Sequence, residues 1–414
     1  MDYLETLCSS AKKASRFLRR ASTLDKSRAL VRIADELRNN AEKICAENDK
    51  DVISARENGM REVMIDRLKL TPERINSIAS AVEEVIALDD PIGRITDMKT
   101  RPNGLKIGKK TVALGVIGVI YESRPNVTVD TAVLCLKSSN AVILRGGSDA
   151  YNSNKILSDI MRNALSDEGF DPNCICFMDD TSRETVTEFM KMDKYVDVLI
   201  PRGGAGLINT VVHNSTIPVI QTGVGNCHIY IDKSADAEMA ADIVINAKTS
   251  RPSVCNAAET VLIHKDADEK VFKLLEEKLK EKHVELRGCK ETMKKIDCDA
   301  EATEQDYETE FLALTLAIRT VNSLDEAMEH IEKYSTGHSE CIVTNDWKNA
   351  NRFLDEIDSA AVYVNASTRF TDGNEFGLGA EIGISTQKLH ARGPMGLEEL
   401  TSTKYIVLGD GQIR

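Results

Sequence analysis

The sequence has no excess of basic residues and no long apolar run, and each absence excludes a class of protein. Its formal net charge is −13, which argues against a nucleic-acid partner because such partners favour a basic patch. No run approaches the roughly 18 apolar residues that a membrane span needs, so we expect no membrane partner. Residues 1–5 lack a basic region followed by an apolar core, so we expect no secretory signal.

The sequence also lacks a paired cysteine motif, although it has ten cysteines. Cys174 and Cys176 stand too close together to match the CxxC spacing, and we expect them in a buried strand. We therefore expect no metal site. A long chain with scattered, unpaired cysteines is typical of a reducing compartment, which predicts a cytoplasmic protein.

The chain is long enough for several hydrophobic cores. It has 414 residues, 42% of them hydrophobic, which predicts two or three domains. Residues 1 to about 90 have apolar positions at helical spacing, and Thr71, Pro72 and Glu73 are typical of a helix start.

From Thr111 onwards, apolar runs alternate with helical stretches, which predicts a wound α/β fold with strands covered on both faces. We expect the strands at 112–121, 141–144, 196–200, 227–231, 260–263, 311–318 and 361–364. The segment 265–300 is rich in Lys, Glu and Asp, so we expect a solvated helix and an exposed loop there.

Cys255 lies between an expected helix, which begins near Ala235, and an expected strand near Thr260. Pro252 requires the helix to end before it, so Cys255 falls in a short loop. A cysteine thiolate is a strong nucleophile and its thioester can be reduced. Taken alone, Cys255 is expected to be structural like most cysteines, and its place in a loop weakens that expectation only modestly.

The segment 121–127 joins the expected strand end at Tyr121 to a helix that we expect near Thr128. Ligands bind at the carboxyl ends of strands in open α/β sheets. Asn126 could donate a side-chain N–H to a developing oxyanion, an effect worth about 3 kcal/mol. Arg124 could pair with a phosphate or carboxylate. The stretch alone favours a turn asparagine and a surface arginine over these binding roles.

Two glycine turns follow expected strands and precede expected helices. The first contains Arg145, Gly146 and Gly147, and the second contains Gly203 and Gly204. Glycines let the backbone approach a phosphate, and the following helix supplies N–H donors. Neither turn matches the GxGxxG fingerprint, so each alone is a tight turn or a phosphate site. Two such turns on successive strands favour a dinucleotide.

With these segments in order, the chain resembles the γ-glutamyl phosphate reductase family, also called glutamate-5-semialdehyde dehydrogenases, within the aldehyde dehydrogenase superfamily. The most specific stretch is VNSLDEAMEHIEKYSTGHSECI at 321–342, in which Met328 replaces the usual branched aliphatic residue. RPSVCN at 251–256, ESRPNV at 122–127 and the tail from Phe376 to Leu400 also resemble the family. His330 and His338 belong to the first stretch, and we expect both to have packing roles.

The resemblance implies a Rossmann-like cofactor domain, an α/β catalytic domain and a small β flap that mediates oligomerisation. The cofactor domain corresponds to 1–97 and 116–231, with a return segment at about 369–395. The catalytic domain corresponds to 232–368, and the flap to 98–115 and 396–414. We therefore expect a homo-oligomer.

The resemblance also implies the roles of individual residues. Cys255 matches the nucleophile and Asn126 matches the asparagine that binds the oxyanion. Arg145 matches the position, usually lysine, that meets the adenosine ribose of the cofactor. The residues expected to bind the cofactor are Arg145, Gly146, Gly203 and Gly204, with Glu310 at the nicotinamide ribose. NADPH is the usual donor of the family, and this assignment depends on the resemblance alone.

One departure from aldehyde-oxidising relatives bears on the mechanism. Those relatives have a glutamate before a glycine pair, which activates the water that hydrolyses the thioester. The corresponding residue here is Gln221, which cannot act as a general base. A reductase that starts from an acyl phosphate needs no water, so Gln221 favours reduction.

The family reaction is the NADPH-dependent reduction of L-glutamyl 5-phosphate to L-glutamate 5-semialdehyde, the second step of proline biosynthesis from glutamate. The substrate carries carboxylate and phosphate groups, and Arg124, Arg251 and Lys248 are the expected anion-binding residues. The resemblance also suggests glutamate 5-kinase as a protein partner. The residues themselves do not indicate whether the two enzymes associate. Two alternatives remain within enzymes: an aldehyde oxidiser, which Gln221 disfavours, and a reductase of a different acyl group. A third alternative is a silent scaffold, which the retained Cys255, Asn126 and both glycine turns disfavour.

Overall fold

The structure is a computed structural model that describes residues 3–414 in two compact units. Unit 1 extends to Thr222 and regains Gly377–Gly383 and Met395–Arg414, whereas unit 2 consists of Gly223–Phe376 and Ile384–Pro394. In the described part of the chain, no helix is long and apolar enough to cross a membrane.

Unit 1 begins with helices, as the sequence predicts. They are α1 (Tyr3–Leu18), α2 (Thr23–Asn39), α3 (Ala41–Glu57), α4 (Glu62–Leu68) and α5 (Pro72–Ala87). The predicted start of α5 is confirmed, because the Thr71 side chain accepts a hydrogen bond from the Arg74 N–H and Pro72 occupies the first turn.

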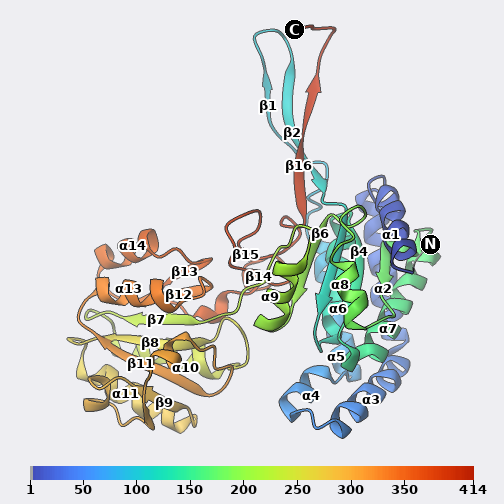
Figure 1. Ribbon diagram of the computed structural model, residues 1–414. Coiled ribbons are helices and arrows are strands. Elements are labelled where there is room, and N and C mark those ends of the chain that lie inside the picture. Colours follow the sequence, from blue (N-terminus) through green and yellow to red (C-terminus); the bar gives the residue numbers. More distant parts are fainter. Residues whose placement is uncertain (1–2) are drawn as a thin grey trace. The chain divides into compact units, whose positions relative to one another are not determined.

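A parallel four-stranded sheet forms the centre of unit 1 (Figure 1). Its order is β5 (Ile175–Phe177), β4 (Ala141–Gly146), β3 (Val116–Tyr121) and β6 (Val198–Arg202). The intervening helices are α6 (Pro125–Lys137), α7 (Tyr151–Asp167), α8 (Arg183–Phe189) and α9 (Ala205–Asn214). The order reverses at β3, because β4 and β5 lie on one side of it and β6 on the other. In open α/β sheets, ligands bind at such a reversal.

The predicted strand at 112–121 is two strands, and the physical reason is Gly115. Its φ is +134°, and an added Cβ would lie 2.2 Å from the Asp197 Oδ2. The chain therefore turns between β2 (Lys106–Ala113) and β3. β2 instead pairs antiparallel with β1 (Ile95–Thr100) and β16 (Thr401–Leu408), in a separate three-stranded sheet. This small sheet contains the segments expected in the flap.

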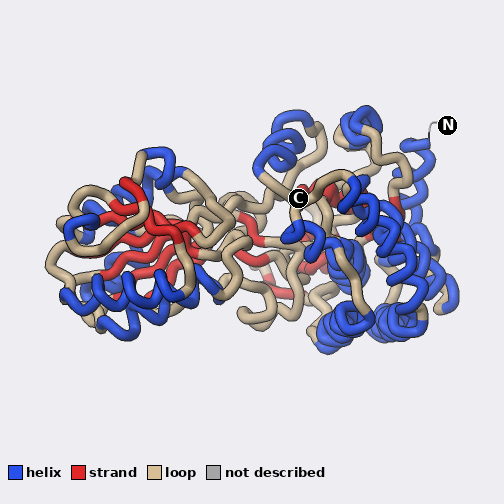
Figure 2. The backbone as a smooth tube through the Cα atoms, turned by 90° about the horizontal axis from the view of Figure 1, so that it is seen from below, coloured by secondary structure: helices blue, strands red, loops and turns tan. Residues whose placement is uncertain are grey.

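Unit 2 is built on a seven-stranded sheet whose neighbouring strands are all parallel. In spatial order these are β10 (Ala300–Glu301), β9 (Glu285–Gly288), β11 (Thr315–Val321), β8 (Ala258–His264), β7 (Cys227–Ile231), β12 (Ser339–Val343) and β13 (Ala361–Val364). Helices cover both faces (Figure 2). One core includes α10 (Ala237–Thr249) and α11 (Glu269–Glu281), and the other includes α13 (Leu324–Tyr334) and α14 (Trp347–Glu356).

Three features of unit 2 differ from the sequence expectations. The return segment expected in the cofactor domain at about 369–395 lies mostly in unit 2, which extends to Phe376 and includes Ile384–Pro394. β7, which we assigned to the cofactor domain, pairs with β8 and β12 in the sheet of unit 2. The segment 265–300 is not only solvated, because α11 buries Val271, Phe272 and two leucines in the core. The charged residues of this amphipathic helix lie on the face opposite to the buried one. The many charges in the segment therefore hide its apolar stripe when only the amino-acid composition is considered.

Candidate active site

In unit 1, Asn126 lies in the first turn of α6 rather than in a loop before the helix. α6 begins at Pro125, earlier than the expected start near Thr128, because proline is well suited to the first helical position. The Asn126 side chain is exposed, and its Nδ2 donates a hydrogen bond to the Asp130 Oδ2 at 3.0 Å. Arg124 is the N-cap residue of the same helix.

The second glycine turn, after β6, already holds a carboxylate. Gly204 is the N-cap residue of α9, and its N–H donates to the Glu122 Oε2 at 3.0 Å. An added Cβ at Gly203 would lie 2.5 Å from the Glu122 carboxyl carbon. This turn therefore binds a negative group at a helix N-terminus, which is the property a pyrophosphate site requires.

The first glycine turn, after β4, is more closely packed. An added Cβ at Gly146 would lie 2.1 Å from the Asn154 Nδ2, so this glycine lets α7 approach the strand. The Arg145 guanidinium donates to the Thr181 carbonyl oxygen at 2.6 Å. Burial lowers the pKa of Arg145, and the negative charges of Asp149 and Asp180 oppose that shift.

In unit 2, Cys255 lies in the short connection between α10 and β8, as the sequence predicts. It is half-buried, and the Cys227 thiol donates to its backbone carbonyl at 3.1 Å. An added Cβ at Gly225 would lie 1.5 Å from the same carbonyl oxygen, so only glycine fits there. The next residue, Asn256, is also fixed, because its Nδ2 donates to the Thr371 carbonyl at 2.9 Å. The loop is thus held on both sides.

An arginine that the sequence interpretation missed lies beside the Cys255 loop. Arg369 donates to the Asn256 Oδ1, and its Nε donates to the Ser250 Oγ at 3.0 Å. Burial lowers the pKa of Arg369, the nearby charge of Arg251 lowers it further, and Cys255 is among the groups that oppose the shift. Two cations therefore lie within electrostatic range of the thiol loop. No local motif marks Arg369, because the 3₁₀ turn Thr368–Phe370 brings it from a distant part of the chain.

Glu310 and Lys248 lie close to this loop but differ in what they can bind. The Glu310 Oε1 accepts the Gly225 N–H at 2.8 Å, and burial raises the pKa of Glu310. Lys248 is fully buried, and its Nζ lies 2.5 Å from the Glu259 Oε2. Because that ammonium is already neutralised and shielded from solvent, we assign Lys248 to a buried ion pair rather than to a substrate anion.

His330 and His338 are both buried in unit 2. The His338 Nδ1 lies 2.8 Å from the Ser339 Oγ and 3.8 Å from the Cys227 Sγ. Burial lowers the pKa of His338 to about 4, and burial is also the main cause that lowers the pKa of His330 to about 2. Both imidazoles are therefore neutral at pH 7, as packing roles require.

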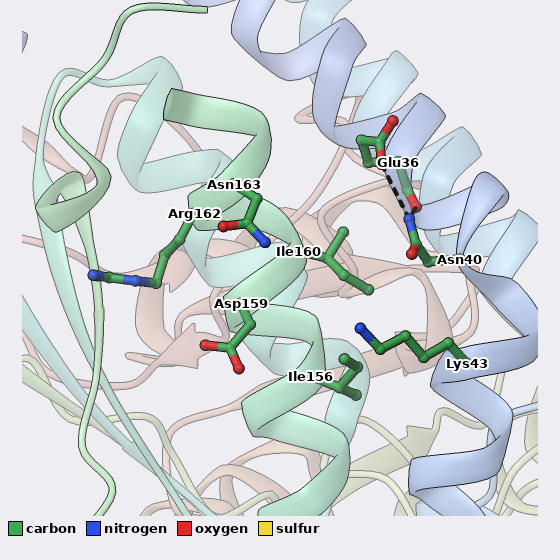
Figure 3. Close-up of a pocket in the computed structure, with 8 residues that line it drawn as sticks. All are labelled: Glu36, Asn40, Lys43, Ile156, Asp159, Ile160, Arg162 and Asn163. Carbon is green, nitrogen blue, oxygen red and sulfur yellow. Dashed lines mark hydrogen bonds between the residues drawn. The ribbon is translucent and has the colours of Figure 1, made fainter. Parts of the chain in front are cut away.

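Two cavities lie apart from the predicted site residues. One, of about 300 Å³, lies between the α2–α3 region and α7, and its lining includes Lys43 and Asp159 (Figure 3). The other, of about 480 Å³, is lined by α13, α14 and the adjoining loops. None of the residues expected to bind substrate or cofactor lines either cavity.

The fold and the site together define a class. A Rossmann-like unit with a glycine turn at its strand-order reversal accompanies a parallel α/β unit with a cysteine loop, which is the organisation of aldehyde dehydrogenases. The sequence matches the aldehyde dehydrogenase family over residues 2–293 and 299–406.

Individual relatives narrow this class. The gamma-glutamyl phosphate reductase of Lachnospira eligens is 55% identical over 417 residues, which cover 100% of both chains. That of Listeria innocua is 57% identical and covers 98% of both. The crystal structure of gamma-glutamyl phosphate reductase from Thermotoga maritima has a TM-score of 0.97 at 49% identity and covers 100% of both chains. The chain therefore belongs to the gamma-glutamyl phosphate reductase family of oxidoreductases.

More distant structures share the fold alone. An acetylating aldehyde dehydrogenase from Geobacillus thermoglucosidasius has a TM-score of 0.73 at 18% identity, with 99% of this chain covered. The aldehyde-dehydrogenase-like α/β fold expected from the resemblance is thus confirmed.

Proposed function

We propose that this chain reduces L-glutamyl 5-phosphate to L-glutamate 5-semialdehyde and phosphate, with NADPH, in proline biosynthesis. The observation that carries the proposal is the Cys255 loop, fixed by Gly225 and Cys227 and accompanied by Arg251 and Arg369. The names of the relatives give the reductase activity, and the loop supplies a nucleophile suited to it.

In the proposed reaction, the Cys255 thiolate attacks the γ-acyl carbon and the C–O bond to phosphate breaks. The Asn126 side-chain N–H and the Cys255 backbone N–H stabilise the oxyanion. The resulting thioester accepts hydride at its carbonyl carbon and becomes a thiohemiacetal. When this collapses, the C–S bond breaks, the semialdehyde leaves and the thiolate is restored.

NADPH supplies the hydride when it is bound. The second glycine turn suits its pyrophosphate, because the Gly204 N–H already binds a carboxylate oxygen and an added Cβ at Gly204 would meet no atom within 4 Å. Arg145 would hold the adenosine ribose and Glu310 the nicotinamide ribose. Gly146 would contribute indirectly, by letting α7 pack closely against β4.

The carboxylate and phosphate of the substrate call for cationic side chains. We assign them to Arg251 and Arg369, next to the Cys255 loop, and to Arg124 at the start of α6. Gln221 cannot activate water, so the thioester is protected from hydrolysis until hydride arrives.

The reverse reaction tests the proposal. Wild-type protein should reduce NADP⁺ only when both glutamate semialdehyde and phosphate are supplied, and Cys255→Ala should lose this activity at least about 1,000-fold. Simple aldehydes without phosphate should be poor substrates. Phosphate-independent oxidation of simple aldehydes at a comparable rate would contradict the proposal and favour an aldehyde oxidiser.

A further inference from the structure

Asp130 lies one helical turn after Asn126 on the same face of α6, and its role is not accounted for by the proposed reaction. Residues four apart on a helix are neighbours, so the two side chains can meet without any distortion. The Asn126 Nδ2 donates to the Asp130 Oδ2 at 3.0 Å. An amide nitrogen has two N–H groups, and this bond uses only one of them.

The Asp130 carboxylate has surroundings that favour a fixed position. It is half-buried, and burial raises its pKa to about 6, while the Asn126 hydrogen bond and the charge of Arg202 oppose that rise. Arg202 is the last residue of β6. Its guanidinium packs closely against Gly383, because a Cβ added at Gly383 would lie 2.6 Å from the Arg202 Nη1. The Asp130 carboxylate thus accepts a hydrogen bond from an amide on its own helix and lies within electrostatic range of the Arg202 guanidinium at the end of β6.

We propose that Asp130 is a positioning residue, which fixes the Asn126 amide in one orientation and leaves its second N–H for the oxyanion. The inference rests on the proposed function, in which Asn126 is an oxyanion donor. An exposed asparagine without such a partner would rotate among several orientations, and a donor is effective only when it is already aimed at the developing charge. Asp130 acts through Asn126 and touches no reacting atom.

A double-mutant cycle tests this role, with kcat and KM measured for wild type, Asn126→Ala, Asp130→Ala and the double variant. Asn126→Ala should lower kcat by about 100-fold, as the loss of one oxyanion donor does in other enzymes. Asp130→Ala should lower kcat by about 10-fold or more with little change in KM. The double variant should be no slower than Asn126→Ala, because Asp130 then has nothing to position.

Two further variants separate positioning from folding. Asp130→Asn keeps an oxygen acceptor for Asn126 and should retain most activity at pH 8. Asp159→Ala removes an exposed aspartate that pairs with Lys155 on α7, and should leave activity unchanged. Thermal unfolding of each variant checks that the helix is intact.

The pH profile gives an independent readout. As the pH falls through about 6, wild-type Asp130 becomes protonated and accepts the Asn126 N–H less strongly, so kcat should fall. Asp130→Asn has no such titration and should lose that limb of the profile.

The outcomes distinguish this inference from the proposed function. If Asn126→Ala keeps full activity, the oxyanion role itself is wrong. If Asn126→Ala is impaired but Asp130→Ala is not, only the positioning role is wrong. An equal fold-loss from Asp130→Ala in the wild-type and Asn126→Ala backgrounds would also overturn it, because Asp130 would then act independently.

Discussion

Two single residues, Gly225 and Cys227, fix the backbone of the Cys255 loop through its carbonyl group. Gly225 leaves room for the Cys255 carbonyl, and the Cys227 thiol satisfies that same oxygen. The two cations beside the loop belong to different parts of the sequence, Arg251 four residues before the thiol and Arg369 on a distant turn. In the proposed reaction, these two cations bind the carboxylate and phosphate of the substrate.

We predict that Arg251→Leu and Arg124→Leu weaken substrate binding. Hydrogen bonds to charged groups contribute about 1.5–3 kcal/mol, so each variant should raise the KM for semialdehyde or phosphate by about 10- to 100-fold. Steady-state kinetics of the reverse reaction measures this. Arg28→Leu, at an exposed pair with Asp25, is the matched control. If both variants keep wild-type KM and kcat, neither arginine binds substrate.

Glu122 gives a second prediction at this scale. Its carboxylate occupies the Gly204 N–H, which the cofactor pyrophosphate would need, and like charges repel. Glu122→Gln should therefore tighten NADPH binding by several-fold at low salt, with a smaller gain at high salt. A fluorescence titration of NADPH measures the Kd, and Glu36→Gln on α2 is a matched control. Weaker binding in Glu122→Gln would mean that Glu122 serves the cofactor instead.

Sequence reasoning reached the residues that lie within recognisable segments and missed those brought in by the fold. Cys255 could be placed in a loop because Pro252 ends the preceding helix, and the structure has that loop. Arg369 and Cys227 approach the loop only through long-range packing, which spacing cannot reveal. Lys248 was predicted to bind a substrate anion because it lies close to Cys255 in the sequence. Closeness in the sequence does not show which way a side chain points, and the Lys248 side chain points into the core.

At the scale of elements, α10 and β8 are joined by a buried ion pair, Lys248 and Glu259, besides the Cys255 connection. Burial raises the pKa of Glu259 to about 7 although Lys248 opposes the rise. Burial also lowers the pKa of Lys248. The charged forms are therefore costly, and each is tolerated because the other is present.

We predict that Lys248→Met destabilises the protein by about 3–5 kcal/mol, because it leaves a buried carboxyl group without its partner. Urea unfolding measures the loss. The double variant Lys248→Met with Glu259→Leu should recover most of it, since no unpaired charge remains. An equally unstable double variant would show that packing of the lysine stem, not the charge pair, is what matters.

The sequence predicted elements well where one residue pattern dominated. β7 and β13 have the predicted bounds, because each is a continuous apolar run between turns. The run at 112–121 was misread as one strand, since Gly115 breaks it by conformation rather than by polarity. β9 and β10 are short and charged, so no period-two pattern marks them.

At the scale of the whole molecule, the three-stranded sheet of β1, β2 and β16 exposes apolar side chains. Tyr405, Val407 and Leu408 on β16 are 68%, 54% and 56% exposed, and Ile95 on β1 is 51% exposed. Exposed apolar side chains on a sheet favour association with another surface. This agrees with the oligomer that we expect from the family.

We predict that Val407→Lys weakens self-association without unfolding the chain. A charge on the exposed sheet would have to be desolvated in an interface, whereas it remains hydrated in a single copy. Sedimentation velocity measures the oligomeric state, and circular dichroism checks the fold. Lys404→Arg on the same strand is the matched control. If Val407→Lys keeps the wild-type oligomer, this sheet is not the interface.

The central claim is that substrate becomes covalently attached to Cys255. The most direct measurement is peptide mass spectrometry after acid quenching of protein mixed with glutamate semialdehyde and NADP⁺, without phosphate. The account predicts one glutamyl group on the peptide that contains Cys255, lost when phosphate is added and absent from Cys255→Ala. An acyl group on another residue, or full turnover by Cys255→Ala, would contradict it.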